Sequence, residues 1–292
     1  DSLDNKILEL LNDRAGLAVN ISKEKQKSKD IDNFYNPERE AQVISRIKEL
    51  NQGPLSDEGI LKIYRELMSA CLSLEAPLKV SYLGPEGTYT HLATQNHFGA
   101  SVISMSYSSV EDVFMSVEKR DSHYGVVPVE NSTQGIVSST LDMFMKSSLR
   151  ISGEIETSIK HNVLSKSNSL ESIKKIYAHP QSFAQCKQWL EKNYPKIEKV
   201  NVLSNAEAAL IASREKNSAA IASIVAADIY KLNVLNKNIE DNHNNSTRFL
   251  VIGERDTNPS GNDKTSIIVS TKNDSGALYG LLEPLSKYKV SM

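Results

Sequence analysis

Residues 1 to about 75 carry apolar side chains at helical spacing, and no stretch among them alternates between apolar and polar positions. In the first segment the apolar residues recur at intervals of four and three, and Arg14 occupies one position of that seam. Asn36–Pro37 predicts the start of a second helix, because Asn favours the N-cap and Pro the first turn. The Gly53–Pro54 break separates it from a third helix over about 56–75. The pattern predicts a thin three-helix bundle that a second copy of the chain completes.

From Lys79 onward the pattern changes to apolar strands alternating with helices. The segments KVSYLG, GVVPVE, KKIYAH and SAAIA predict strands, each followed by a helix, near 89–98, 138–146, 181–193 and 223–230. This alternation favours parallel α/β sheets, which bind ligands at the carboxyl ends of their strands. About 180 residues of it exceed one sheet, so the pattern predicts two lobes around a cleft.

After this region the polar segment ERDTNPSGNDK is typical of a linker. TSIIVST then predicts a strand and GALYGLLEPLSKY a helix, a pair that cannot bury a core without a partner. The 292 residues therefore divide into three expected domains. These are an all-helical domain over 1–76, a two-lobed α/β domain over 78–255 and a partial α+β domain over 264–292.

Composition and charge exclude several classes of partner and site. The 34 Lys and Arg nearly balance the 36 Asp and Glu, so no overall field attracts nucleic acid or an anionic membrane. The two cysteines are too few for a disulfide framework, and no Cys/His spacing suggests a metal site. There is no signal-peptide pattern and no run of about 18 apolar residues. We expect a soluble cytoplasmic protein with no metal and with neither a nucleic-acid nor a membrane partner.

Several polar side chains of the helical segment could gather around one small dianion: Arg14, Lys25, Arg39, Glu40, Cys71 and Glu75. Arg14 and Lys25 are about three helical turns apart, so both project to nearly the same side of the first helix. The alternative is a solvated salt-bridge face, and for Lys25 the sequence leaves both interpretations open. For Arg14 it favours function, because a cation in an apolar seam is costly without an anion.

The segments LDNKILELLNDRAGLAVNISKEK, FYNPEREAQVI and IYRELMSACLSLE resemble, in order, the all-helical chorismate mutase family. The resemblance implies that Arg14 grips a substrate carboxylate and that Lys25 contacts the ether oxygen. It implies that Glu40, next to Arg39, holds the substrate hydroxyl, and that Glu75 lies beside the ether oxygen. Asn36 stands where some members have Asp, and Cys71 where some have Ser.

The family also uses an arginine near the start of the first helix, at a point before this sequence begins, so mutase activity is expected to suffer if that arginine is absent. The reaction is an intramolecular rearrangement without proton transfer, which needs a fixed compact conformer and stabilised charge on the ether oxygen. Glu75 must be protonated to donate a hydrogen bond there. Burial is therefore expected to raise its pKa, and the mutase is expected to weaken as pH rises.

In the α/β region, polar groups follow the ends of several apolar strands. The turn GPEGTYT places Gly87 and Thr88 where backbone N–H groups could hold an anion, although many plain turns look the same. VPVENS delivers an acid, an amide and a hydroxyl at the end of one strand. In HPQS, His179 fits a structural histidine and Gln181 a ligand. The remaining candidates are the helix-capping pair Ser204–Asn205 and, ahead of FLVIG, Thr247 and Arg248.

Five segments in order over about 78–253, GPEGTYT, VPVENST, HPQS, SNAEAA and NSTRF, resemble the prephenate dehydratase family. The resemblance implies two α/β lobes with the active site between them. It also implies loss of the ring hydroxyl and ring carboxylate of prephenate to give phenylpyruvate, with no cofactor because aromatisation drives the step. Thr247 matches the essential threonine of the family and is expected to hydrogen-bond the leaving oxygen, with a proton relayed from Glu130 or water. The cleft is expected to be lined by Glu130, Asn131, Ser132 and Gln181, with Gly87, Thr88, Ser204, Asn205 and Arg248 as further contacts.

SIIVSTKNDSGALYGLLEPL resembles the opening of an ACT regulatory domain, in which Gly276, Ala277 and Leu278 match a turn that binds phenylalanine between paired domains. A second motif of that domain would fall beyond Met292, so we expect weakened feedback, unless the sequence is part of a longer chain. Together the resemblances imply a bifunctional enzyme of phenylalanine biosynthesis that acts on chorismate and prephenate, responds to phenylalanine and forms a homodimer or higher oligomer. A two-lobed sensor that binds without turnover, and an enzyme with one surviving activity, are the alternatives.

Overall fold

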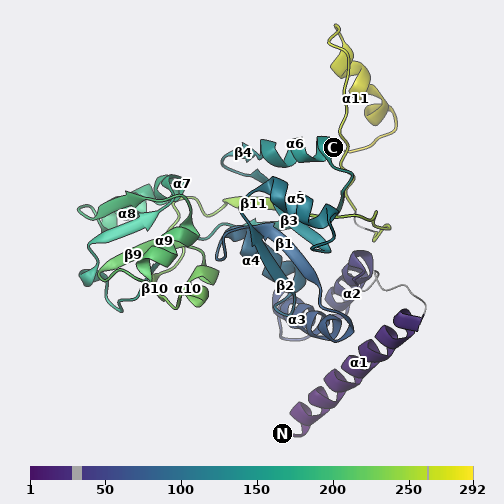
Figure 1. The fold of residues 1–292 in the computed structure, drawn as a ribbon, viewed down its shortest axis with the longest axis horizontal. Coiled ribbons are helices and arrows are strands. Elements are labelled where there is room, and N and C mark those ends of the chain that lie inside the picture. The colour runs from purple at the N-terminus through teal and green to yellow at the C-terminus, as the bar shows by residue number, and fades with distance from the viewer. Residues whose placement is uncertain (28–34, 262, 292) are drawn as a thin grey trace. The chain divides into compact units, whose positions relative to one another are not determined.

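The computed structural model describes residues 1–27, 35–261 and 263–291, and it divides into two compact units, Asp1–Ser260 and Gly261–Met292 (Figure 1). The first unit begins with the helices α1 (Ser2–Lys27), α2 (Pro37–Leu50) and α3 (Asp57–Glu75). Asn36 caps α2, because its Oδ1 accepts the N–H of Arg39 at 2.7 Å. Helices α1 and α3 pack against each other. The helical prediction for this segment is confirmed.

The apolar stripe of α1 is largely uncovered within a single chain. Leu3, Leu10 and Leu17 are 64% to 69% exposed, and Ile7 is 53% exposed. The prediction that a second copy of the chain completes the bundle requires such an exposed row of apolar side chains.

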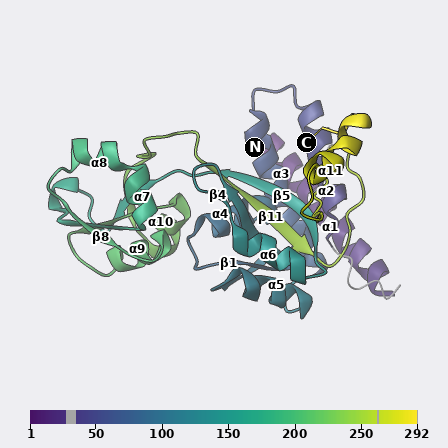
Figure 2. The ribbon, with the colours of Figure 1, turned by 90° about the horizontal axis from the view of Figure 1, so that it is seen from above.

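The first lobe is built on a six-stranded sheet of order β2-β1-β3-β11-β5, with β4 paired to β3. Its strands are β1 (Lys79–Leu83), β2 (Ile103–Tyr107), β3 (Tyr124–Asn131), β4 (Gly135–Ile136), β5 (Arg150–Ser158) and β11 (Ser246–Gly253). The helices α4 (Tyr89–Phe98), α5 (Val110–Glu118) and α6 (Ser138–Lys146) pack on it. Adjacent residues of β3 point to opposite faces of the sheet and enter two cores: Val126 packs on the α4 side, and Val127 packs on the side of α5 and α6. Figure 2 shows these helices beside the sheet.

The second lobe has a five-stranded sheet of order β10-β6-β9-β7-β8. Its strands are β6 (Asn162–Ser165), β7 (Lys175–Ala178), β8 (Glu198–Asn201), β9 (Ser218–Ala222) and β10 (Asn233–Asn236). Its helices are α7 (Pro180–Gln185), α8 (Lys187–Asn193), α9 (Asn205–Ala212) and α10 (Ile224–Tyr230). Buried alanines of α9 and β9 allow helix and sheet to approach closely.

Three sequence expectations need correction. Both sheets are mixed and not parallel, since β11 runs antiparallel to β3 and β5, and β6 runs antiparallel to β9 and β10. The helix expected over 181–193 is interrupted at Cys186, whose backbone leaves the helical region. The segment 265–271 forms no strand, because no neighbouring strand pairs with it, whereas the helix that follows is present as α11 (Ala277–Lys287).

The helical segment is anchored on the first lobe. Ser69 Oγ accepts the N–H of Ser101, and Glu66 accepts the N–H of Ala100, at the end of α4. The ring of Tyr35, next to the start of α2, is buried in the aromatic core of the lobe against Phe98 and Tyr124. Helix α3 and Tyr35 therefore share buried surface with the first lobe.

Candidate active sites

The helical site gathers a cation and a carboxylate from two helices. Lys25 Nζ donates to Glu75 Oε2 at 3.4 Å, and Ser22 Oγ donates to the Glu75 carbonyl at 3.1 Å. Cys71 is buried one turn before Glu75, and Arg14 is half-buried three turns before Lys25 on α1. Lys25 and Glu75 therefore form an ion pair between α1 and α3, and the pH dependence expected from Glu75 stays a prediction.

Glu40 is the most perturbed carboxyl of the helical segment. Burial raises its pKa to about 7, while a hydrogen bond from Tyr35 and the charge of Arg65 act in the opposite direction. Arg39 is exposed and donates through Nη1 to Gln42 Oε1 at 3.4 Å.

Asn36 caps α2, as predicted from the sequence, and its expected substrate-binding role stays a prediction. Its Oδ1 is occupied by the cap of α2.

In the first lobe, β3 ends beside the start of β11, and this register brings together two motifs more than a hundred residues apart. Thr247 pairs with Asn131, and Asn131 Nδ2 donates to Thr247 Oγ1 at 2.7 Å. Asn131 Oδ1 accepts the backbone N–H groups of Thr133 and Gln134 at 3.0 and 3.1 Å, which fixes the orientation of the amide. Thr247 is therefore a hydrogen-bond acceptor toward Asn131, and its own hydrogen is left for another partner.

Asn245 completes this cluster and was not among the sequence candidates. Its Oδ1 faces the hydroxyls of Ser132 and Thr133, both at 3.2 Å, and the amide of Asn131 at 3.3 Å. Its Nδ2 is buried and, among the described residues, has no hydrogen-bond partner. The only sequence signal for it was its place at the start of NSTRF.

Glu130 and Arg248 lie on the opposite face of the sheet from Thr247. They pair with each other in the register, and Arg248 Nη2 lies 3.4 Å from Glu130 Oε2. Adjacent residues of a strand point to opposite faces, so the register that directs Asn131 toward Thr247 directs Glu130 away from it. The expected proton relay from Glu130 to Thr247 therefore needs correction, and Arg248 binds carboxylates of its own sheet.

The turn between β1 and α4 is ordered by its own hydrogen bonds. Gly87 has φ +88°, a conformation that favours glycine. Thr88 caps α4 by accepting the N–H of His91 at 3.3 Å, and its hydroxyl donates to the Leu83 carbonyl at 3.3 Å. Thr88 thus has a structural role in the free protein, which is the plain-turn alternative.

The second-lobe candidates also have structural partners. Ser204 caps α9 by accepting the N–H of Glu207 at 3.0 Å. Asn205 Oδ1 accepts the N–H of His179 at 3.0 Å and faces the Ser182 hydroxyl at the same distance. Gln181 is half-buried in the first turn of α7, and His179 Nδ1 accepts its N–H at 3.3 Å. His179 is the structural histidine that we expected.

Two family models match the chain, chorismate mutase type II over residues 1–76 and prephenate dehydratase over residues 80–257. The bifunctional chorismate mutase/prephenate dehydratase of Pseudomonas aeruginosa is 49% identical over 288 residues, which cover 97% of this chain and 79% of that protein. The protein of the same name from Aquifex aeolicus is 45% identical, with 100% of this chain and 81% of that protein covered. The chain belongs to the bifunctional chorismate mutase/prephenate dehydratases.

Members of this family carry two enzyme activities, and the chain is an enzyme with both, chorismate mutase and prephenate dehydratase. A solved structure supports the fold of the dehydratase part. The prephenate dehydratase of Arthrobacter aurescens, in complex with L-Phe, is 27% identical with a TM-score of 0.64, and the match covers 72% of each chain. The comparisons do not support the sensor alternative.

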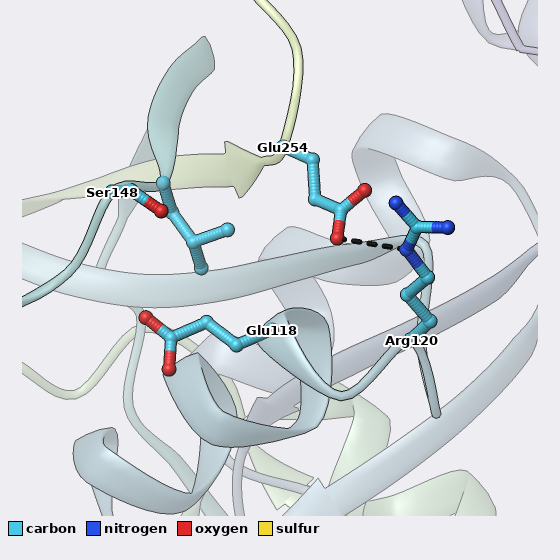
Figure 3. Close-up of a pocket in the computed structure, with 5 residues that line it drawn as sticks. Glu118, Arg120, Ser148 and Glu254 are labelled. Carbon is cyan, nitrogen blue, oxygen red and sulfur yellow. Dashed lines mark hydrogen bonds and ion pairs between the residues drawn. The ribbon is translucent and has the colours of Figure 1, made fainter.

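Other features of this bifunctional chain lie outside the two sites. A pocket of about 430 Å³ is lined by Glu118, Arg120, Ser148, Leu149 and Glu254. Arg120 Nε lies 3.0 Å from Glu254 Oε1, and Figure 3 marks this ion pair between two of the lining residues. In the unit Gly261–Met292, Gly276 has φ +82° ahead of α11, and Leu278 is 68% exposed.

Among the described residues, no cluster of three His, Cys, Asp or Glu side chains is placed to hold a metal ion. In the same part of the chain, no helix has the length and apolar character needed to span a bilayer.

Proposed function

We propose that this enzyme of phenylalanine biosynthesis rearranges chorismate to prephenate on its helical segment. In a second reaction it converts prephenate to phenylpyruvate where β3 ends beside β11. The hydrogen bond from Asn131 Nδ2 to Thr247 Oγ1 carries the dehydratase assignment. This hydrogen bond connects two sequence motifs of the family and leaves the hydroxyl hydrogen of Thr247 available to donate to the substrate.

In the dehydratase reaction the bond to the ring carboxylate breaks, carbon dioxide leaves, and the electron pair of that bond passes through the ring and breaks the ring C–O bond in the same step. The departing hydroxyl takes up one proton and leaves as water. Because Thr247 accepts from Asn131, its O–H is free to donate to the departing oxygen, and the bond it accepts makes it a better donor. A threonine hydroxyl is a weak acid, so water supplies the proton.

In the mutase reaction the side chains act on charge and conformation. We assign Lys25 to the ether oxygen, where its ammonium stabilises the negative charge that grows in the transition state. We assign Arg14 to a substrate carboxylate. Glu40 in its ionised form accepts a hydrogen bond from the substrate hydroxyl. Glu75, which accepts a hydrogen bond from Lys25 Nζ at 3.4 Å, positions that ammonium beside the ether oxygen.

Separate assays with the two starting compounds test this proposal. With chorismate, prephenate forms and is then consumed; with prephenate, phenylpyruvate forms directly and is detected by its absorbance in alkali. Binding of prephenate without consumption would favour the sensor alternative. Turnover of one compound alone would show that a single activity remains.

The same proposal includes a homodimer or higher oligomer and feedback by phenylalanine. The exposed apolar stripe of α1 supports the first, since a second copy would cover it. The second is supported by the likeness of Gly276–Leu278 to an ACT turn and by the solved dehydratase that binds L-Phe. The buried free cysteines Cys71 and Cys186 fit the reducing cytoplasm. Inhibition in a phenylalanine titration tests the regulatory part.

A further inference from the structure

His91, in the first turn of α4, makes a contact that neither reaction uses directly. Its Nδ1 accepts the backbone N–H of Gly87 at 3.1 Å, and its ring stacks on Tyr82 with centroids 4.7 Å apart and planes 5° apart. The residue is only 5% exposed. An imidazole nitrogen can accept this bond only when it carries no proton, so the geometry specifies the tautomer.

The other ring nitrogen completes the assignment. Nε2 lies 3.2 Å from the side-chain amide of Gln95, one turn further along α4. The nearest atom of that amide is Gln95 Nε2. With Nδ1 as acceptor, a neutral ring has its proton on Nε2, and the Gln95 amide turned by 180° accepts that proton through its oxygen. Both nitrogens are therefore used, and a second proton would place N–H against the N–H of Gly87.

The Gly87 peptide is also held from the second lobe. Ser223 Oγ, at the start of α10, donates to the Gly87 carbonyl at 2.7 Å, and this bond is buried. Tyr230 donates its hydroxyl to the Glu86 carbonyl at 3.1 Å. A Cβ on Gly87 would lie 3.3 Å from both Ala226 and Tyr230, so α10 packs directly on the turn. The Glu86–Gly87 peptide unit thus binds His91 of the first lobe through the Gly87 N–H and Tyr230 of the second lobe through the Glu86 carbonyl, and Ser223 binds the carbonyl of the next unit.

We propose that His91 is a positioning residue for the dehydratase: in its neutral form it fixes the Gly87 peptide, through which the first lobe is joined to α10 of the second. This inference rests on the dehydratase function proposed above. Protonation of His91 removes the acceptor for Gly87, loosens the turn and reduces dehydratase turnover in acid.

The surroundings of His91 favour the neutral form. Burial lowers its pKa, and Glu86 on the turn opposes that effect in part. The other titratable groups near it are Tyr82 on β1, whose pKa burial raises, and Tyr230 on α10, whose pKa is raised by burial and by Glu86. Both tyrosines stay neutral at physiological pH, so Glu86 is the charged group that influences His91.

The test compares two substitutions over pH 5 to 8. His91→Asn places an amide oxygen near the position of Nδ1 and does not titrate, while His91→Phe keeps the stacking on Tyr82 and removes the acceptor. Dehydratase kcat and KM are measured with prephenate, and an enzyme-free blank at each pH corrects for spontaneous aromatisation. Mutase turnover of each variant, compared with that of the wild type at the same pH, shows that the variant chain is folded.

We expect the wild-type dehydratase to lose activity toward pH 5, and His91→Asn to flatten this loss. His91→Phe is expected to lower kcat/KM by about 10-fold or more at every pH, because the Gly87 N–H loses its acceptor. His123→Asn is the matched control, since His123 Nδ1 accepts the N–H of Lys79 at 3.0 Å at the exposed start of β1. Its pH profile should equal that of the wild type.

An unchanged acid loss in His91→Asn, or full activity in His91→Phe, would overturn the role of His91. Either result with an active wild type leaves the dehydratase assignment intact. Absence of prephenate consumption by the wild type at every pH would instead refute the proposed function itself.

Discussion

At the scale of single residues, the dehydratase site depends on the orientation of one amide. Asn131 faces Thr247 with its nitrogen because its oxygen already binds two backbone N–H groups. The reverse orientation would leave three donors facing one another. The neighbouring hydroxyl is therefore free to donate, a property that follows from the local turn and not from Thr247 alone.

Replacing Thr247 with Val removes the hydroxyl and keeps the shape of the side chain. We expect dehydratase kcat to fall by about 100-fold or more, the scale of a lost transition-state hydrogen bond, while mutase kcat is unchanged. Thr247→Ser, which keeps the hydroxyl, should recover a substantial part of the activity. Steady-state assays with each starting compound measure both, and a dehydratase that tolerates Val would remove Thr247 from the mechanism.

Tyr35 controls the protonation of Glu40. Its hydroxyl binds Glu40 and lies 3.5 Å from Nε2 of His97, a buried histidine whose pKa is lowered to about 4. Glu40 with a pKa of about 7 loses its charge as pH falls through 7, so mutase activity should fall on the acid side. Tyr35→Phe removes a bond that lowers this pKa, and the acid fall should begin about half to one pH unit higher.

The pH dependence of mutase kcat/KM measures this effect. Tyr124→Phe is the control, because the Tyr124 ring contacts Tyr35 edge-on without being a hydrogen-bond partner of Glu40. A profile that does not move in Tyr35→Phe would show that Glu40 is not the group titrating.

At the scale of elements, the turn after β1 and the β3–β11 register position the dehydratase residues. The register shifts between Arg248 and Phe249, and this irregularity decides which side chains of β3 and β11 share a face. The sequence motifs identified the correct segments. They did not show that the alternation of side chains along the paired strands places Glu130 and Thr247 on opposite faces of the sheet.

Gly87→Ala tests the turn at the level of backbone. The substitution adds a Cβ at φ +88° and places it 3.3 Å from Ala226 and Tyr230. Gly135→Ala is a matched control, because Gly135 has φ +80° and an added Cβ meets nothing within 4 Å. We expect Gly135→Ala to cost about 1 kcal/mol of unfolding free energy from backbone strain alone, and Gly87→Ala to cost more and to reduce dehydratase turnover. Denaturant unfolding and prephenate assays compare them; equal effects would contradict the packing of α10 on the turn.

At the scale of the whole molecule, the mutase differs from the dehydratase because the apolar stripe of α1 is exposed within one chain. The dehydratase residues are held by two buried cores, whereas Arg14 lies on a helix whose apolar positions are open within one chain. Covering that stripe with a second copy would remove apolar surface from water and fix α1.

Leu10→Glu introduces a charge in the middle of this stripe, where Leu10 is 67% exposed. We expect the oligomer to dissociate and mutase kcat/KM to fall by about 10-fold or more, because a buried unpaired charge is costly, while dehydratase activity persists. Met145→Glu on α6, at a site 68% exposed, is the control and should leave the oligomer intact. Light scattering measures the oligomeric state, and the two assays measure the activities. A wild type that is monomeric at assay concentration would contradict the prediction.

The sequence by itself determined the three-helix segment, the alternating α/β region and both family resemblances, because helical spacing, caps and ordered motifs are local properties of the chain. It did not determine the mixed sheets, the missing strand over 265–271 or the commitment of Thr88 to a helix cap. Nor did it reveal Asn245, Tyr35 or His91. Those depend on which distant backbone groups become neighbours and on which donors are already occupied, and only the packing of the folded chain decides that.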